Sequence, residues 1–256
     1  MKQKLIVANW KMAPATLAEA QRILEFIDDY LSTIPEQKLF SLVVCPPFIF
    51  IEEVAKMLAT YHLAHYSSLG AQDIFWENQT PHTGEISGPM LAKLGVRYVI
   101  IGHSERRWEM GESDNVVNQK LKAALQNELI PIVCVGEQIR DEEFRSFLQN
   151  QVRATFADLN SQEISKCIIA YEPVWAISSS PGARPDTPES ALQSIQIIQE
   201  TLGVTDNIIL YGGSVTSGNV ADFISLEQIQ GVLVGGASLK KDEFVKILSV
   251  AATFHK

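Results

Sequence analysis

The segment Ile168-Ile169-Ala170-Tyr171-Glu172-Pro173 decides both the fold and the place of the chemistry. Its apolar residues follow one another without the three- and four-residue spacing of an amphipathic helix, which predicts a buried strand. Runs that are apolar throughout are typical of parallel strands, because helices cover both faces of such a sheet. Glu172 directly follows the run, so the segment also predicts a carboxyl group where a buried parallel strand ends.

Similar runs recur along the chain and alternate with helix-length segments. They lie at Leu5–Asn9, Phe40–Cys45, Leu69–Gln72 (a weaker one), Tyr98–Gly102, Ile130–Val135, Ile208–Tyr211 and Gly231–Val234. Apolar residues recur at helical spacing around Leu17–Leu31 and Phe244–Ala251, which predicts helices that pack one face on the sheet. Thr187-Pro188-Glu189 has a hydroxyl cap and a proline at the first helical position, which predicts a helix start and leaves Pro173–Asp186 as a long loop.

Eight strand-then-helix units favour an α/β fold, either a closed (β/α)8 barrel ringed by helices or a doubly wound sheet. Periodicity alone does not choose between the two. The length of 256 residues fits one barrel domain over residues 1–256, because such barrels commonly have about 250 residues.

The composition excludes several classes of partner. A formal net charge of −9 would repel nucleic acid and anionic membrane surfaces. The apolar run near the amino terminus, Leu5–Ala8, is too short for a signal peptide or a membrane span, so we expect a cytoplasmic protein. The three cysteines, Cys45, Cys134 and Cys167, lack CxxC spacing and favour buried reduced thiols over a disulfide or a metal site.

Polar residues that end the apolar runs are the candidates for catalysis, since barrel enzymes place their active sites at the carboxyl ends of the strands. They are Asn9, Lys11, His103, Glu137 and Glu172. Taken singly, Glu172 also fits a structural carboxylate, His103 a structural histidine and Lys11 a solvated lysine. Their convergence on one face of a barrel favours catalysis, with Glu172 as a general base and the other two stabilising a developing negative oxygen.

Two glycine pairs end the last two runs, Gly212-Gly213 and Gly235-Gly236. A glycine pair by itself usually marks a turn. Barrels often bind phosphate after strands seven and eight, however, so these pairs favour a phosphorylated ligand, with Ser214 and Ser238 as further hydroxyl donors. The sequence has no nicotinamide fingerprint, Walker A run, HExxH pair or metal-ligand spacing, so we expect neither cofactor nor metal.

The longer motifs resemble those of the triosephosphate isomerase family, in the same order and over essentially the whole chain. They are Asn9–Met12, Tyr98–Arg107, Ala170–Ile177, Tyr211–Val215 and Gly231–Leu239. The resemblance implies a TIM barrel that interconverts D-glyceraldehyde 3-phosphate and dihydroxyacetone phosphate through an enediolate, in glycolysis and gluconeogenesis. It also implies a homodimer.

The resemblance assigns roles to individual residues. Glu172 becomes the base, His103 a neutral electrophile, Lys11 the cation near the enediolate and Asn9 a polar support, while Glu105 and Tyr211 have supporting roles. Ser178, Ser214 and the two glycine pairs become the phosphate site. Gln72, Thr83 and Glu85 become interface residues of the homodimer.

The sequence departs from the family pattern in the lid over the substrate. The usual Gly-Thr-Gly-Lys is replaced by the longer segment Ser178–Asp186, in which Pro181 and Pro185 lack a backbone N–H. Ala13 stands where the family usually has asparagine, and Thr80-Pro81-His82 precede Thr83 in place of Gly-Ala-Phe. Two alternatives remain at this point: an isomerase of a larger phosphosugar such as a tetrulose phosphate, and a non-catalytic phosphosugar-binding protein.

Overall fold

Eight parallel strands form a closed barrel in the computed structural model, which describes residues 3–35, 40–60, 62–177 and 182–254. The strands are β1 (Lys4–Asn9), β2 (Phe40–Cys45), β3 (Ser67–Ala71), β4 (Tyr98–Ile101), β5 (Ile130–Val135), β6 (Ile168–Tyr171), β7 (Ile209–Tyr211) and β8 (Gly231–Val234). Each pairs with its neighbours in sequence, and β8 closes on β1. The barrel is therefore confirmed, and the doubly wound sheet is excluded.

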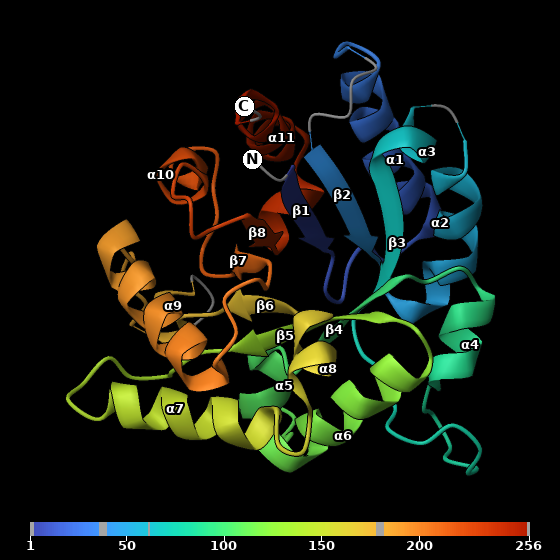
Figure 1. Ribbon diagram of the computed structural model, residues 1–256. Helices are drawn as coiled ribbons and strands as arrows, with labels where there is room; N and C mark the ends of the chain where they lie inside the picture. Colours follow the sequence, from blue (N-terminus) through green and yellow to red (C-terminus); the bar gives the residue numbers. More distant parts are fainter. Residues whose placement is uncertain (1–2, 36–39, 61, 178–181, 255–256) are drawn as a thin grey trace.

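Helices surround the barrel (Figure 1). They are α1 (Leu17–Leu31), α2 (Ile51–Leu58), α3 (Leu63–Tyr66), α4 (Gly88–Lys93), α5 (Ser104–Trp108), α6 (Asp114–Gln126), α7 (Phe144–Thr155), α8 (Ser161–Ser165), α9 (Pro188–Leu202), α10 (Val220–Ile224) and α11 (Lys241–Thr253). Short 3₁₀ turns lie at η1 (Phe48–Phe50), η2 (Val174–Ala176) and η3 (Gly236–Leu239). Within the described ranges, no helix is both long and apolar enough to cross a membrane.

Local sequence explains where the helices begin. Thr16 and Glu19 form a reciprocal capping box at the start of α1, which satisfies backbone N–H groups that the helix leaves unpaired. The predicted start of α9 is confirmed, because the Thr187 side chain accepts a hydrogen bond from the Ser190 N–H and Pro188 is the first helical residue. The predicted loop Pro173–Asp186 contains the 3₁₀ turn η2.

Alternation along the strands separates two apolar layers. Leu5 and Val7 of β1 belong to a cluster formed by strand residues, whereas Ile6 and Ala8 belong to a larger cluster that includes the helices. Because successive side chains of a strand point to opposite faces, the first cluster fills the barrel and the second lies under the helices. Gly231 fits this closure, since an added Cβ would lie 1.8 Å from the Leu5 carbonyl oxygen.

Strand ends differ slightly from the prediction. β3 covers Ser67–Ala71 and not Leu69–Gln72, because Ser67 and Ser68 pair with β2 despite their polarity. Gly102 and Glu172 lie one residue beyond β4 and β6. All three cysteines are buried and free, as expected.

Candidate active site

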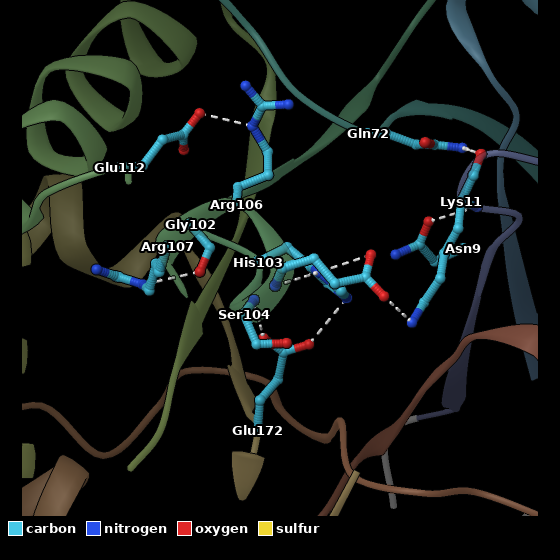
Figure 2. Close-up of polar contacts among 11 residues, drawn as sticks. Asn9, Lys11, Gln72, Gly102, His103, Ser104, Arg106, Arg107, Glu112 and Glu172 are labelled. Carbon is cyan, nitrogen blue, oxygen red and sulfur yellow. Dashed lines mark hydrogen bonds and ion pairs between the residues drawn. The ribbon is translucent and has the colours of Figure 1, made fainter. Parts of the chain in front are cut away.

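Four of the five strand-end candidates line one cavity of about 580 Å³ at the carboxyl ends of the strands: Asn9, Lys11, His103 and Glu172. Asn9 ends β1, His103 follows β4 by two residues, and Glu172 directly follows β6. Glu105 also lines the cavity, together with the two glycine pairs and Ser214. Figure 2 shows Lys11 and Asn9 facing His103 and Glu172 from the opposite side. The convergence that the sequence predicts is therefore present.

Two groups next to β4, the Ser104 N–H and the His103 ring, lie against the Glu172 carboxylate. The Glu172 side chain is 2% exposed; Oε2 accepts a hydrogen bond from the Ser104 N–H at 2.8 Å, and Oε1 lies 3.1 Å from His103 Nε2. Its carboxylate also contributes, after burial, to raising the pKa of the Cys134 thiol well above its usual value. The carboxylate is therefore shielded from water but not left without hydrogen bonds.

Glycines make room for Glu172. An added Cβ at Gly212 would come within 2.9 Å of Glu172 Cγ, and one at Gly136 within 1.8 Å of the Glu172 carbonyl oxygen. Distances below 3.0 Å require a shift of one of the two groups, and the backbone at Glu172 has little freedom to move. The residues after β5 and β7 thus fit closely around Glu172, Gly136 against its backbone and Gly212 against its side chain.

The hydrogen bond at Nδ1 determines which nitrogen of a neutral His103 carries the proton. Nδ1 accepts from the Glu105 N–H at 3.3 Å, and a nitrogen that accepts a hydrogen bond carries no proton. Nε2 then bears the hydrogen. Glu172 Oε1 lies 3.1 Å from this nitrogen. His103 is buried at 6% exposure, so its Nε2–H is a fixed donor at the edge of the cavity.

Lys11 adopts a left-handed backbone with φ of 55°, which costs a residue other than glycine about 1 kcal/mol or more. Side chains on both sides hold this conformation. Asn9 Oδ1 accepts from the Lys11 N–H at 3.0 Å, and Gln72 Nε2 donates to the Lys11 carbonyl at 2.9 Å. The Lys11 ammonium lies 2.5 Å from Glu105 Oε1. Hydrogen bonds therefore hold the backbone of Lys11, and an ion pair holds the end of its side chain.

Gln72 is a supporting residue whose role here the sequence did not indicate. Its amide also donates to the Cys45 carbonyl at 2.9 Å, so Gln72 links the loop after β1 to the end of β2. The expectation for Gln72 concerned a subunit interface, a different role. The position of Gln72 directly after a strand could have indicated a residue near the site. The carbonyl groups that its amide contacts depend on the path of the loops, which the sequence does not show.

Two consecutive arginines anchor α5, which carries Ser104 and Glu105. Arg107 donates to the carbonyl oxygens of Gly102 and Cys134 at 2.8 and 3.1 Å, and it pairs with Asp114 at 2.6 Å. Arg106 pairs with two acids that also bind the buried Lys120. These acids are Asp73 and Glu112. Burial is the main cause that raises the pKa of Asp73.

The residues predicted to bind phosphate differ in where they lie. Both glycine pairs and Ser214 line the cavity, and Ser214 Oγ donates to the Ala176 carbonyl at 2.9 Å. Ser238 was a wrong candidate, because it is buried and its hydroxyl donates to the Gly235 carbonyl at 2.7 Å. Ser178 lies outside the described residues.

Glu137 and Tyr211 lie behind the cavity. Glu137 Oε1 accepts from the Tyr171 hydroxyl at 2.9 Å, from Trp175 Nε1 at 3.0 Å and from Arg140 at 2.9 Å. Burial first, and then the charge of Glu137, raises the pKa of Tyr171. Glu137 therefore supports the beginning of the loop after β6. Among the described residues, no group of three or more His, Cys, Asp or Glu side chains is placed to hold a metal ion.

The fold and the site define a class, that of (β/α)8-barrel enzymes that transfer protons next to a carbonyl group. Residues 4–251 match the sequence profile of the family described as triosephosphate isomerase. Curated relatives named triosephosphate isomerase include those of Moorella thermoacetica (41% identical, 97% of this chain and 99% of that protein) and Dehalococcoides mccartyi (42%, 98% and 98%). A relative of that name from a Roseiflexus species is 42% identical over 97% of both chains. The chain belongs to the triosephosphate isomerase family.

Arg107→Met is expected to lower the free energy of unfolding by about 3 kcal/mol, because buried carbonyl oxygens and Asp114 lose a charged donor. Urea denaturation followed by circular dichroism measures the change. Arg145→Met is the matched control, since its side chain is 51% exposed and its loss should cost less than about 0.5 kcal/mol. An equal effect of the two substitutions would contradict the anchoring role of Arg107.

Proposed function

We propose that this protein interconverts D-glyceraldehyde 3-phosphate and dihydroxyacetone phosphate by proton transfer between adjacent carbons. The observation that carries the proposal is the convergence of Glu172, His103 and Lys11 on one cavity that the two glycine pairs also line. The family membership supports the same reaction. The alternatives of a larger phosphosugar and of a non-catalytic protein are not favoured.

Glu172 is the proposed base. It removes the proton from the carbon next to the carbonyl and returns it to the neighbouring carbon. The hydroxyl proton passes from one oxygen to the other in the same conversion, so no atom is gained or lost overall. In the present arrangement its oxygens are occupied by the Ser104 N–H and by His103. The carboxylate must turn away from these donors to reach the substrate carbon, and this frees the His103 Nε2–H. A positioned base contributes about 10²–10⁴-fold to the rate.

His103 and Lys11 stabilise the oxygen that becomes negative. The Nε2–H of His103 donates to this oxygen, and the Lys11 ammonium lies across the cavity as a fixed cation. Each such donor contributes about 10²–10³-fold. Glu105 keeps the ammonium in place through the 2.5 Å ion pair, and Asn9 keeps the Lys11 backbone in its left-handed conformation.

The substrate phosphate binds between the turns after β7 and β8. Glycines allow a ligand to approach the backbone closely, and backbone N–H groups bind anions without adding net charge. Gly213, Ser214 and Gly236 all line the cavity. Ser178 from the preceding loop completes the proposed set.

The finer proposals concern assembly and setting. We propose one barrel domain over residues 1–256, a cytoplasmic protein that acts in glycolysis and gluconeogenesis, and a homodimer.

The homodimer is supported by exposed apolar side chains on the loops after β1 and β2: Met12 is 98% exposed and Ile49 79%. Strand β3 is the neighbour of β2 in the barrel, and the connection after β3 contains the exposed residues Thr83 and Glu85. Exposed apolar groups on the loops of neighbouring strands are typical of an interface.

Glu172→Gln should lower kcat by at least about 10²-fold, because the amide keeps the shape of the side chain but cannot accept the carbon-bound proton. A coupled assay with glyceraldehyde 3-phosphate measures the rate, and thermal unfolding checks the fold. Glu25→Gln, an exposed position of α1, is the control and should match the wild type. A Glu172→Gln variant that keeps more than about a tenth of the activity would show that another group is the base.

The wild type should sediment as a dimer, and Ile49→Glu should shift it toward the monomer, because the substitution places a charge in the proposed apolar interface. Sedimentation velocity at several concentrations measures both. Ile139→Glu is the control, because Ile139 is 65% exposed in the loop after β5. A monomeric wild type at all concentrations would refute the homodimer.

A further inference from the structure

Glu243 is an acid that lines the cavity but has no role in the proposed reaction. It is the third residue of α11, the helix that follows η3 and the turn after β8. The two glycine pairs line the same cavity. Because a carboxylate repels a phosphate that binds near it, the contacts of Glu243 decide what it contributes to this end of the barrel.

Both carboxylate oxygens of Glu243 accept hydrogen bonds from Ser217, which lies in the loop after β7. Oε2 accepts from the Ser217 N–H at 3.0 Å, and Oε1 accepts from the Ser217 hydroxyl at 3.1 Å. These two hydrogen bonds, the backbone one first, lower the pKa of the Glu243 carboxyl, so it is charged at neutral pH. The carboxylate thus joins the loop after β7 to the helix after β8.

A second side chain closes the loop that Glu243 holds. Asn219 Nδ2 donates to the Ser214 carbonyl at 2.8 Å, and Asn219 Oδ1 accepts from the Thr216 N–H at 2.8 Å. Ser217 lies between Thr216 and Asn219, and Ser214 directly follows the first glycine pair. The position of Ser217 therefore determines that of Ser214 and of the turn before it.

Helix α11 gives Glu243 a fixed base. Phe244 and Ile247 of this helix are buried, and the Phe244 N–H donates to the Lys240 carbonyl at 2.8 Å. The turn η3, which begins at Gly236, leads directly into this part of the chain. Glycines have no side chain that could hold the turns after β7 and β8 at a set distance. Glu243 supplies such a link from outside the turns.

We propose that Glu243 is a positioning residue that fixes the two phosphate-binding turns relative to each other, by holding the loop after β7 to the start of α11. The inference rests on the proposed function, because that function places the substrate phosphate between these turns. A positioning role and a pure effect of charge predict opposite results. Removal of the negative charge alone would strengthen phosphate binding, whereas loss of the link should weaken it.

The test compares Glu243→Ala, Glu243→Gln and Ser217→Ala with the wild type. Glu243→Ala should raise KM for glyceraldehyde 3-phosphate and the dissociation constant of inorganic phosphate, measured by calorimetry, by about tenfold, because both hydrogen bonds are lost. kcat should stay within about threefold. Glu243→Gln keeps one acceptor oxygen and should recover most of the affinity. Asp242→Ala is the control, because it removes the same charge from an exposed position in the first turn of α11.

The direction of the change decides between the two roles. Stronger phosphate binding by Glu243→Ala, or an affinity unchanged from that of Asp242→Ala, would overturn the inference. Ser217→Ala removes one of the two hydrogen bonds and should raise the same dissociation constant about threefold. It replaces Glu243→Ala as the deciding variant if thermal unfolding shows that Glu243→Ala does not fold, and an unchanged affinity would then count against the inference.

The wild type separates this inference from the proposed function. A wild type that binds phosphate but does not isomerise would refute the proposed function alone, while the phosphate titrations would still decide the role of Glu243. Failure of the wild type to bind phosphate would refute the inference as well.

Discussion

Eight parallel strands that close on themselves bring all their carboxyl ends to the same end of the barrel, and the site depends on this constraint. Asn9 and Glu172 lie far apart in sequence, yet both line the same cavity. Chain closure between β8 and β1 brings the last glycine pair beside Lys11, where an added Cβ at Gly235 would come within 3.0 Å of Lys11 Cε. The barrel thus supplies proximity, and the loops need to supply orientation.

The catalytic side chains are oriented by hydrogen bonds and ion pairs from residues that do not take part in the reaction. The arginine pair fixes α5 from two sides, through Asp114 and through the acids around Lys120. Asn9 and Gln72 hold the backbone of Lys11 in a conformation that it would not adopt by itself. Catalytic groups need to be held within a fraction of an ångström, and such supports provide this on short loops.

Local patterns in the sequence predict the parallel strands and the polar side chains at their ends, whereas the choice of a closed barrel over a doubly wound sheet came from the resemblance to the family. An apolar run without helical spacing indicates a buried strand, and the polar residue after it indicates the rim of the barrel, as at His103 and Glu172. The sequence does not predict contacts that depend on the exact path of a loop. Ser238 follows a glycine pair as a phosphate-binding serine would, but the 3₁₀ turn η3 directs its hydroxyl to Gly235. Tyr211 was expected in a supporting role, but its contact with Gly213 depends on how the turn packs.

The three buried cysteines have a consequence for an enzyme that handles aldehydes. Thiolates add to aldehyde carbonyl groups and are alkylated by reactive breakdown products of sugar phosphates. Burial raises the pKa of all three thiols, that of Cys167 to about 12, and the charge of Glu172 acts in the same direction on Cys134. Cys134 therefore lies beside the base as a neutral thiol at physiological pH. The protein can keep sulfur in its core without exposing a competing nucleophile to its own substrate.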